Sequence, residues 1–295
     1  MTTHRSVSSL GTSDDAIPNR DGRLAAARSI LAELSSVSRP EREHSVNNEA
    51  SNLVSLGIDD LDAHLAGGLK RTGVHEVFAS AIGDETAATG FVAGLSACAM
   101  RDRPGPVLWI DTLFSAQEDG LLWPPGLADW GIAPDRLIRA TARHPRDALR
   151  MADDALAMSA LGVVVLELRG PAPMLDLTAL RRLHLGAEAR AVPCFLLRFG
   201  ADPIASPALT RWSIAARPGF ERRSGQGYLE KPNRYLLGHP RFGADLARHR
   251  GGSLGSWLLE WCSDVQSFVA PAAVAISEPA IPPVQHRPYR QTFAA

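Results

Sequence analysis

Five short apolar runs alternate with longer Ala- and Leu-rich segments along the middle of the chain, and this alternation limits the possible folds. The runs cover residues 74–79, 107–111, 137–142, 163–168 and 194–199. Continuous apolar runs between helical segments are what a parallel sheet requires when helices cover both of its faces. We therefore predict an α/β fold with a mostly parallel sheet flanked by helices.

Helix and hairpin signals surround these runs. A His-Pro pair at residues 144–145 predicts the start of a helix, because proline's missing N–H costs nothing in a first helical turn. The apolar spacing of residues 177–190 predicts another helix. Residues 242–261 are typical of a β-hairpin that turns at the Gly-Gly pair 251–252, so we expect a C-terminal hairpin extension of the sheet.

The two ends of the chain differ from this core, to which we assign residues 53–262. Residues 1–21 have too few large apolar side chains to offset the entropy of ordering, so we expect disorder there. Residues 22–52 are expected to form an amphipathic helix and a polar tether. Residues 263–295 contain several prolines and no periodicity, and are expected to form a flexible tail.

The expected N-terminal helix has an apolar face at helical spacing, formed by Leu24, Ala27, Leu31 and Leu34. A lone helix on a tether does not easily bury such a face within its own domain. Two arrangements are equally open: the helix docks on a partner, or it packs back onto the core. In either case the four side chains are candidate contact residues.

The overall composition is that of a globular protein, with 45% hydrophobic residues, 21% charged residues and a net charge of -1. This charge gives no general attraction to nucleic acid, so such contact would need a local basic patch. The widely separated Cys98, Cys194 and Cys262 fit a reducing compartment, and neither they nor the scattered histidines have metal-ligand spacing. Since no run would cross a bilayer and no signal peptide is evident, we expect a cytoplasmic protein without membrane contact or bound metal.

An ordered series of motifs runs from residue 56 to residue 78. It consists of Leu-Gly-Ile-Asp-Asp-Leu-Asp at 56–62, Leu-Ala-Gly-Gly-Leu at 65–69 and a strand-like segment at 73–78. This order resembles the opening of the RecA-type recombinase and ATPase core, which implies a RecA-like fold. In that family the strand ends at a G-x-x-x-x-G-K-[ST] loop, whose backbone N–H groups and lysine hold the phosphates of a nucleotide.

The loop after this strand departs from the family motif. Ala79 and Asp84 replace the two glycines of the motif, and Glu85 stands in place of its lysine. Gly83 lies inside the loop, and Thr86 is the one residue that matches a fixed position of the motif. A carboxylate repels a triphosphate by about 1 kcal/mol per charge pair at about 4 Å, even in water. Side chains at the glycine positions also restrict the backbone. We therefore expect a vestigial phosphate loop and no bound cofactor.

Two more nucleotide positions depart from the family. The resemblance places a catalytic glutamate two residues beyond Asp111, where this chain has Leu113, which cannot activate water. The run at 163–167 resembles a Walker B strand with Glu167 for the metal-directing aspartate, and we expect this side chain to hold a hydroxyl or cap a helix. We predict no catalytic residue and no enzymatic activity. An active ATPase with an aberrant loop is the rival hypothesis.

The resemblance also identifies two segments that bind DNA in active recombinases. Here residues 169–176 and 200–208 are short, contain proline and lack clustered basic or aromatic side chains. Four arginines could form a modest phosphate-contacting patch, although an ordinary solvated face is favoured: Arg181, Arg182, Arg198 and Arg211. We therefore expect DNA binding to be weak or indirect.

A closer resemblance covers residues 53–261. Motifs at 74–77, 105–110, 175–183, 210–212 and 250–261 together resemble the ImuA family, RecA-like bacterial proteins formerly grouped with the cell-division inhibitor SulA. The resemblance implies a non-catalytic accessory protein of DNA-damage-induced mutagenesis in the SOS response. It implies translesion synthesis with ImuB, a Y-family polymerase-like protein, and an error-prone DNA polymerase III alpha paralogue, with RecA as a further candidate partner. A SulA-type inhibitor of cell division is the alternative function.

Four further positions are aromatic or ionisable: Trp257, Trp261, His75 and Glu76. Trp257 and Trp261 are candidate anchors for a partner, although two tryptophans on one strand face more often belong to the core. The hairpin and tail are candidate ImuB contacts, and the placement of the N-terminal helix suggests contact with RecA or a second copy. His75 and Glu76 point to opposite faces of a strand and make a poor acid–base pair, so we expect the imidazole to bond a neighbouring backbone group.

Overall fold

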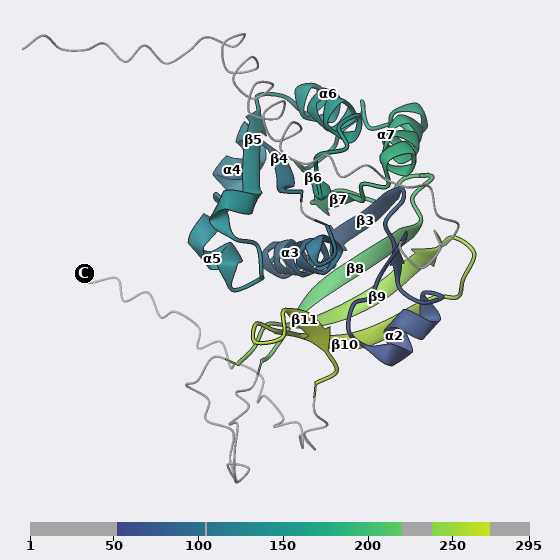
Figure 1. The fold of residues 1–295 in the computed structure, drawn as a ribbon. Helices are drawn as coiled ribbons and strands as arrows, with labels where there is room; N and C mark the ends of the chain where they lie inside the picture. Colours follow the sequence, from purple (N-terminus) through teal and green to yellow (C-terminus); the bar gives the residue numbers. More distant parts are fainter. Residues whose placement is uncertain (1–51, 104, 220–237, 272–295) are drawn as a thin grey trace, which may run out of the picture.

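A computed structural model describes residues 52–103, 105–219 and 238–271 (Figure 1). The expected disordered segment 1–21 lies outside the described residues. So do the candidate contact residues Leu24, Ala27, Leu31 and Leu34, and the chain beyond residue 271.

The main sheet has nine strands in the order β11-β10-β9-β8-β3-β7-β6-β4-β5. The five predicted runs form β3 (Val74–Ala79), β4 (Val107–Thr112), β5 (Leu137–Ala142), β6 (Val163–Arg169) and β7 (Cys194–Phe199). These strands pair in parallel, and β8 (Thr210–Arg217) is parallel to β3. The strands β9 (Arg241–His249), β10 (Gly255–Cys262) and β11 (Ser267–Val269) continue the sheet in antiparallel fashion. The predicted α/β class, a mostly parallel sheet flanked by helices with a C-terminal hairpin extension, is confirmed.

Helices cover both faces of the parallel strands (Figure 1). On one face lies α3 (Glu85–Met100), and on the other lie α6 (Pro145–Leu156) and α7 (Leu177–Arg190), which begin where the sequence predicts. The shorter elements are α2 (Asp59–His64), α4 (Leu113–Glu118), α5 (Pro124–Ala128), the 3-10 turn Pro134–Arg136 and a ribbon of β1 (Leu53–Val54) and β2 (Leu69–Lys70). Within the described ranges, no helix combines the length and apolar character needed to span a membrane.

Each face of the sheet has its own apolar core. Val163 and Val165 belong to the cluster under α3, whereas Val164 and Leu166 belong to the cluster under α6 and α7. This division follows from the alternation of side chains along a strand. It also explains why the predicted runs are continuously apolar, because neither face of these strands meets water.

The C-terminal hairpin forms as predicted, but the core does not end at residue 262. The three-residue strand β11 pairs with β10, and its Phe268 is fully buried against Trp261, with ring centroids 5.2 Å apart. A side chain on Gly94 of α3 would come within 2.6 Å of the Phe268 ring, so this glycine permits the close packing. The expected start of the flexible tail at residue 263 is therefore wrong, since residues 267–269 are part of the sheet.

Candidate functional site

The vestigial phosphate loop connects the carboxyl end of β3 to the first turn of α3. Ala79 ends the strand, Glu85 begins the helix, and Asp84 occupies the N-cap position. The carboxyl edge of a parallel sheet is where α/β proteins place their ligand sites, because the loops converge there. The first turn of a helix also attracts anions to its unpaired N–H groups. The loop thus has the right location for a phosphate site.

Asp84 uses both carboxylate oxygens to bind backbone amides. Its Oδ2 accepts a hydrogen bond from the Ala81 N–H at 3.1 Å, inside the loop. Its Oδ1 accepts one from the Ala216 N–H of β8 at 2.8 Å. The side chain therefore ties the loop to the neighbouring strand and occupies a donor that a phosphate would otherwise need.

Glu85 occupies a second loop amide. Its Oε2 accepts a hydrogen bond from the Gly83 N–H at 2.7 Å, while its Oε1 lies 3.1 Å from Nη2 of Arg169. Burial alone would raise the pKa of Glu85, but the hydrogen bonds from its own amide and the Gly83 amide, together with Arg169, lower it. The carboxylate is therefore held in its charged form, where an ATPase would have a cation.

Arg169, at the end of β6, joins Glu85 to Asp119, which follows α4. Its Nε lies 2.8 Å from Asp119 Oδ2, and its Nη2 also contacts Oδ1 of the same carboxylate. Hydrogen bonding to Asp119 is the main cause that raises the Arg169 pKa. These three residues form an ion cluster at the carboxyl edge. Sequence reasoning missed Arg169 and Asp119 as site residues, because their pairing joins positions 50 residues apart.

The Walker B-like Glu167 is committed to a structural contact. Only 6% of the residue is exposed, and its Oε2 accepts a hydrogen bond from the Trp109 indole N–H at 2.8 Å. Burial raises the pKa of Glu167 to about 7, against the opposing effect of the Trp109 bond. The expected structural role holds, but the expected partner was wrong: an indole takes the place of a hydroxyl or a helix N-terminus.

Of the other nucleotide-site positions, Leu113 lacks a group that phosphate chemistry uses, and Thr86 keeps the hydroxyl of the motif. Leu113 begins α4 with 47% of its surface exposed, and Thr86 is exposed in the first turn of α3. A nucleotide phosphate would have to displace the Asp84 and Glu85 carboxylates from the Ala81 and Gly83 amides and then remain close to both negative charges. In the described part of the chain, no three His, Cys, Asp or Glu side chains are grouped as metal ligands.

The arginines that were expected to share a solvated face are partly used inside the protein. Arg198 is buried and donates to the Gly170 carbonyl at 2.9 Å. Arg211 binds the buried Glu76 carboxylate at 2.6 Å. The expectation of a common solvated face is therefore wrong for Arg198, since the side chain is buried and bonded to the start of the loop that follows β6. Arg182 is exposed and paired to Asp153 at 3.0 Å, and Arg181 is also exposed.

Two relatives decide the family to which the chain belongs. The protein named ImuA in Caulobacter vibrioides, from strain NA1000 / CB15N and from strain ATCC 19089 / CB 15, is 33% identical over 221 residues in each case. The match covers 70% of this chain and 83% of each relative. The chain belongs to the ImuA family. The crystal structure of the RadB recombinase is also similar, with a TM-score of 0.49 and 16% identity, over 74% of this chain and 100% of RadB. No family model matches.

In this ImuA family member, the two candidate anchor tryptophans face the core. Trp261 is 1% exposed and donates its indole N–H to the Asp129 carbonyl at 3.2 Å, so it is not available to a partner. Trp257 is half-buried, packs on Trp212 with centroids 6.1 Å apart, and donates to Asp60 at 3.1 Å. The alternative interpretation of core tryptophans fits both positions.

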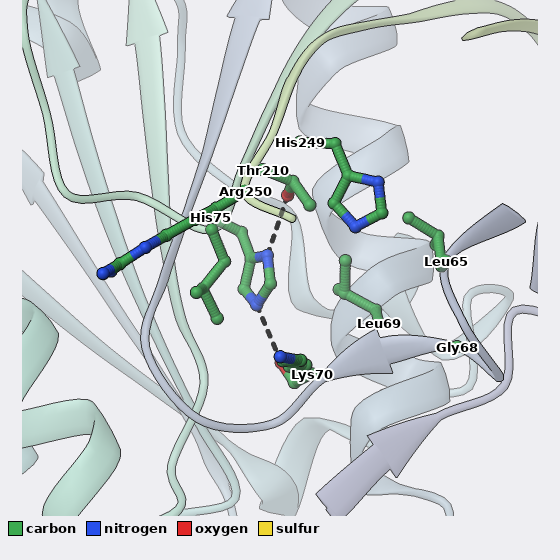
Figure 2. A pocket seen from close by; sticks show the side chains of 9 residues that line it. Leu65, Gly68, Leu69, Lys70, His75, Thr210, His249 and Arg250 are labelled. Atoms are coloured by element: carbon green, nitrogen blue, oxygen red, sulfur yellow. Dashed lines mark hydrogen bonds between the residues drawn. The ribbon is translucent and has the colours of Figure 1, made fainter. Parts of the chain in front are cut away.

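A small cavity lies near the amino end of β3 (Figure 2). It measures about 20 Å³, which is room for a single water. On its wall the buried His75 lies between two partners: Nδ1 is 2.8 Å from the Thr210 hydroxyl and Nε2 is 2.7 Å from the Lys70 carbonyl (Figure 2). Because a carbonyl only accepts, Nε2 carries the proton. The predicted bond from His75 to a neighbouring backbone group is confirmed.

Proposed function

We propose that this chain is a non-catalytic RecA-like accessory protein of DNA-damage-induced mutagenesis. It acts in the cytoplasm in translesion synthesis, together with ImuB and an error-prone DNA polymerase III alpha paralogue, and RecA is a further candidate partner. Its contact with DNA is weak or passes through these partners. Membership of the ImuA family supports the biological role, and the state of the phosphate loop supports the absence of ATP hydrolysis.

One observation is the main support for the non-catalytic assignment. The loop's own carboxylates already bind the loop amides. Ala81 and Gly83 donate to Asp84 and Glu85, so the anion site of this helix start is already filled by the protein. A tethered carboxylate competes with a free phosphate at a high effective concentration, and its charge repels the phosphate as well. This arrangement argues against an active ATPase more directly than the missing lysine does.

A nucleotide titration of the purified full chain tests this assignment. Fluorescent ATP with magnesium should show no saturable binding up to about 1 mM, which corresponds to less than about 4 kcal/mol of binding free energy. The double variant Asp84→Gly, Glu85→Lys is the matched control, because it frees both loop amides and supplies the cation. It should gain detectable affinity. Saturable binding or turnover by the unmodified chain would contradict the proposal.

A mutation assay tests the cellular role. Deleting the gene should lower the frequency of damage-induced mutations, and a plasmid copy should restore it. The variant Thr86→Ala, which removes the one matching motif residue, should restore it equally, because no nucleotide is needed. The SulA-type alternative predicts filamentous cells on overexpression. No observation in the described residues and no comparison favours that alternative.

A further inference from the structure

We propose that the chain's own N-terminal segment, residues 22–34, docks on an exposed apolar surface at the carboxyl edge of the sheet. This surface, the edge patch, consists of Ile82, Leu113, Phe114, Leu121 and Trp123. The proposal goes beyond the function given above and does not depend on it. It chooses between the two arrangements that the sequence leaves open for the amphipathic segment.

The edge patch consists of large apolar side chains that are exposed to solvent. Ile82 is 98% exposed, Trp123 70% and Leu121 64%. Phe114 and Trp123 are the large aromatic side chains exposed within the described ranges, and both belong to this patch. Isolated apolar side chains on a surface are common, but a group of large ones at one edge usually marks a contact site.

The ion cluster brings the parts of the patch together. Glu85 and Asp119 both bind Arg169, which holds the loop after β3 against the segment after α4. Ile82 lies three residues before Glu85, and Leu121 lies two residues after Asp119. Leu113 and Phe114 begin α4 directly after β4, and Trp123 immediately precedes α5, at the side of the sheet where β4 and β5 lie (Figure 1).

The rim of the edge patch has an excess of negative charge. Asp84, Glu85, Glu118 and Asp119 lie in the same two segments as the apolar side chains, and Arg169 is the cation that binds two of them. Such a rim disfavours nucleic acid and anionic lipid, because both would bring like charges together. It favours an apolar segment whose own flanks carry cations.

The N-terminal segment has this pattern. If residues 22–34 form a helix, Arg28 is four residues after Leu24 and three before Leu31, which places it beside the apolar face. Arg23 is four residues before Ala27 and flanks the other side of the face. The cations of this segment therefore border its apolar face and can meet the carboxylates of the rim.

The connecting chain is long enough to allow this docking. Residues 35–52 form a polar connection of about 18 residues. A flexible chain of that length has a mean span of roughly 25 Å and a full reach of roughly 60 Å. It joins the core at β1, which pairs with β2 near the amino end of β3. The carboxyl edge is about one strand length away, roughly 20 Å, and β4 lies three strand spacings across the sheet from β3, roughly 14 Å. The resulting distance of roughly 25 Å is close to the mean span.

Tethering also makes weak docking sufficient. A short helix of this length is marginal in water by itself, so it gains its order only when its apolar face is covered. A flexible tether of this length supplies an effective concentration on the order of 1 mM. Docking with an intrinsic dissociation constant of about 100 µM would then keep the patch about 90% covered.

The test measures acrylamide quenching of Trp123 in the purified full chain. Subtracting the signal of the Trp123→Phe variant isolates this tryptophan from the others. Replacing Leu24 and Leu31 by serine should raise the quenching constant of Trp123 at least about twofold, because docking would be lost. The matched control replaces Ala25 and Ala26 by serine, on other faces of the segment, and should leave quenching unchanged.

Three results would overturn the proposal. Equal quenching in the wild type and in the Leu24→Ser, Leu31→Ser variant would show that the segment does not cover the patch. Protection that appears only as the protein concentration rises from about 1 to 50 µM would assign the patch to a second copy. Protection that appears only on adding another protein would assign it to a partner. A calorimetric ATP titration on the same samples reports separately on the proposed function, because it follows heat and not Trp123.

Discussion

The two ends of strand β3 differ in the charge and burial of their ionisable side chains. At the amino end, His75 is completely buried and each ring nitrogen has a neutral partner, Thr210 or Lys70 O. At the carboxyl end, Glu85 remains charged and is bound by a backbone amide and a guanidinium. The amino end is closed around a cavity with room for one water, whereas the carboxyl end is open and bordered by exposed apolar side chains.

This contrast indicates which end of β3 can serve a function when the amides of the loop after the strand are bound by that loop's own carboxylates. A buried neutral network contributes mainly to stability, and a change there affects the whole fold. Charges at the open edge contribute less to stability, because water screens them. They remain available for contacts with other chains or other segments. The comparison can be tested by substitutions at each end.

The largest expected effect is from His75→Ala at the closed end. The substitution leaves the Thr210 hydroxyl and the Lys70 carbonyl without their partner and creates a cavity under Phe195, whose ring centroid is 5.8 Å from that of His75. The free energy of unfolding should fall by roughly 4 kcal/mol. Urea unfolding followed by circular dichroism measures it. Ile82→Ala at the open end is the control and should change stability by less than about 0.5 kcal/mol. Similar losses in the two variants would remove the contrast.

The second prediction concerns pH, because two buried groups, Glu167 of β6 and His75 of β3, titrate with opposite signs. Burial raises the pKa of Glu167 from 4.5 to about 7, so its contribution to stability is present below 4.5 and is lost as the pH rises through about 7. Burial lowers the pKa of His75 from 6.5 to about 4, so its contribution is present above 6.5 and is lost as the pH falls through about 4.

Glu167→Gln isolates the acidic member of this pair. The amide oxygen can still accept the Trp109 bond, but it has no charge to bury. The variant should match the wild type near pH 4 and exceed it by on the order of 2–3 kcal/mol at pH 8. Chemical unfolding at a series of pH values gives the difference directly. A stability difference that does not grow between pH 4.5 and 7 would show that Glu167 titrates normally.

Much of this fold follows from local sequence patterns. The five apolar runs and the helix Leu177–Arg190 were predictable, because burial on two faces and helical periodicity are both visible within a short window. The departure of the loop from a phosphate motif was predictable for the same reason, since Asp84 and Glu85 lie within six residues of the end of β3. The use of those carboxylates to bind the loop amides was not, because it depends on backbone geometry.

The other features that sequence reasoning missed are contacts between distant segments. Strand β11 is too short to show a period, and it forms because Phe268 fits beside Gly94 of α3. Arg169 meets Asp119 across 50 residues, so no local pattern records the pair. Trp109 binds Glu167 across 58 residues. Tertiary packing decides such pairs, and propensity alone does not reveal them.

The smallest expected effect on stability is from Arg169→Gln at the open end. The substitution removes the cation between Glu85 and Asp119 and leaves their carboxylates facing each other across a partly exposed site. The free energy of unfolding should fall by about 1 kcal/mol at low salt and by less at about 1 M salt, where the charges are screened. The pKa of Glu85 should rise, because Arg169 helps to lower it.

Local opening should increase at the loop, so hydrogen exchange of the Gly83 amide should accelerate while that of Val77 in β3 stays constant. Faster exchange at both amides would mean that the ion cluster stabilises the strand itself, and the two ends of β3 would then not be independent.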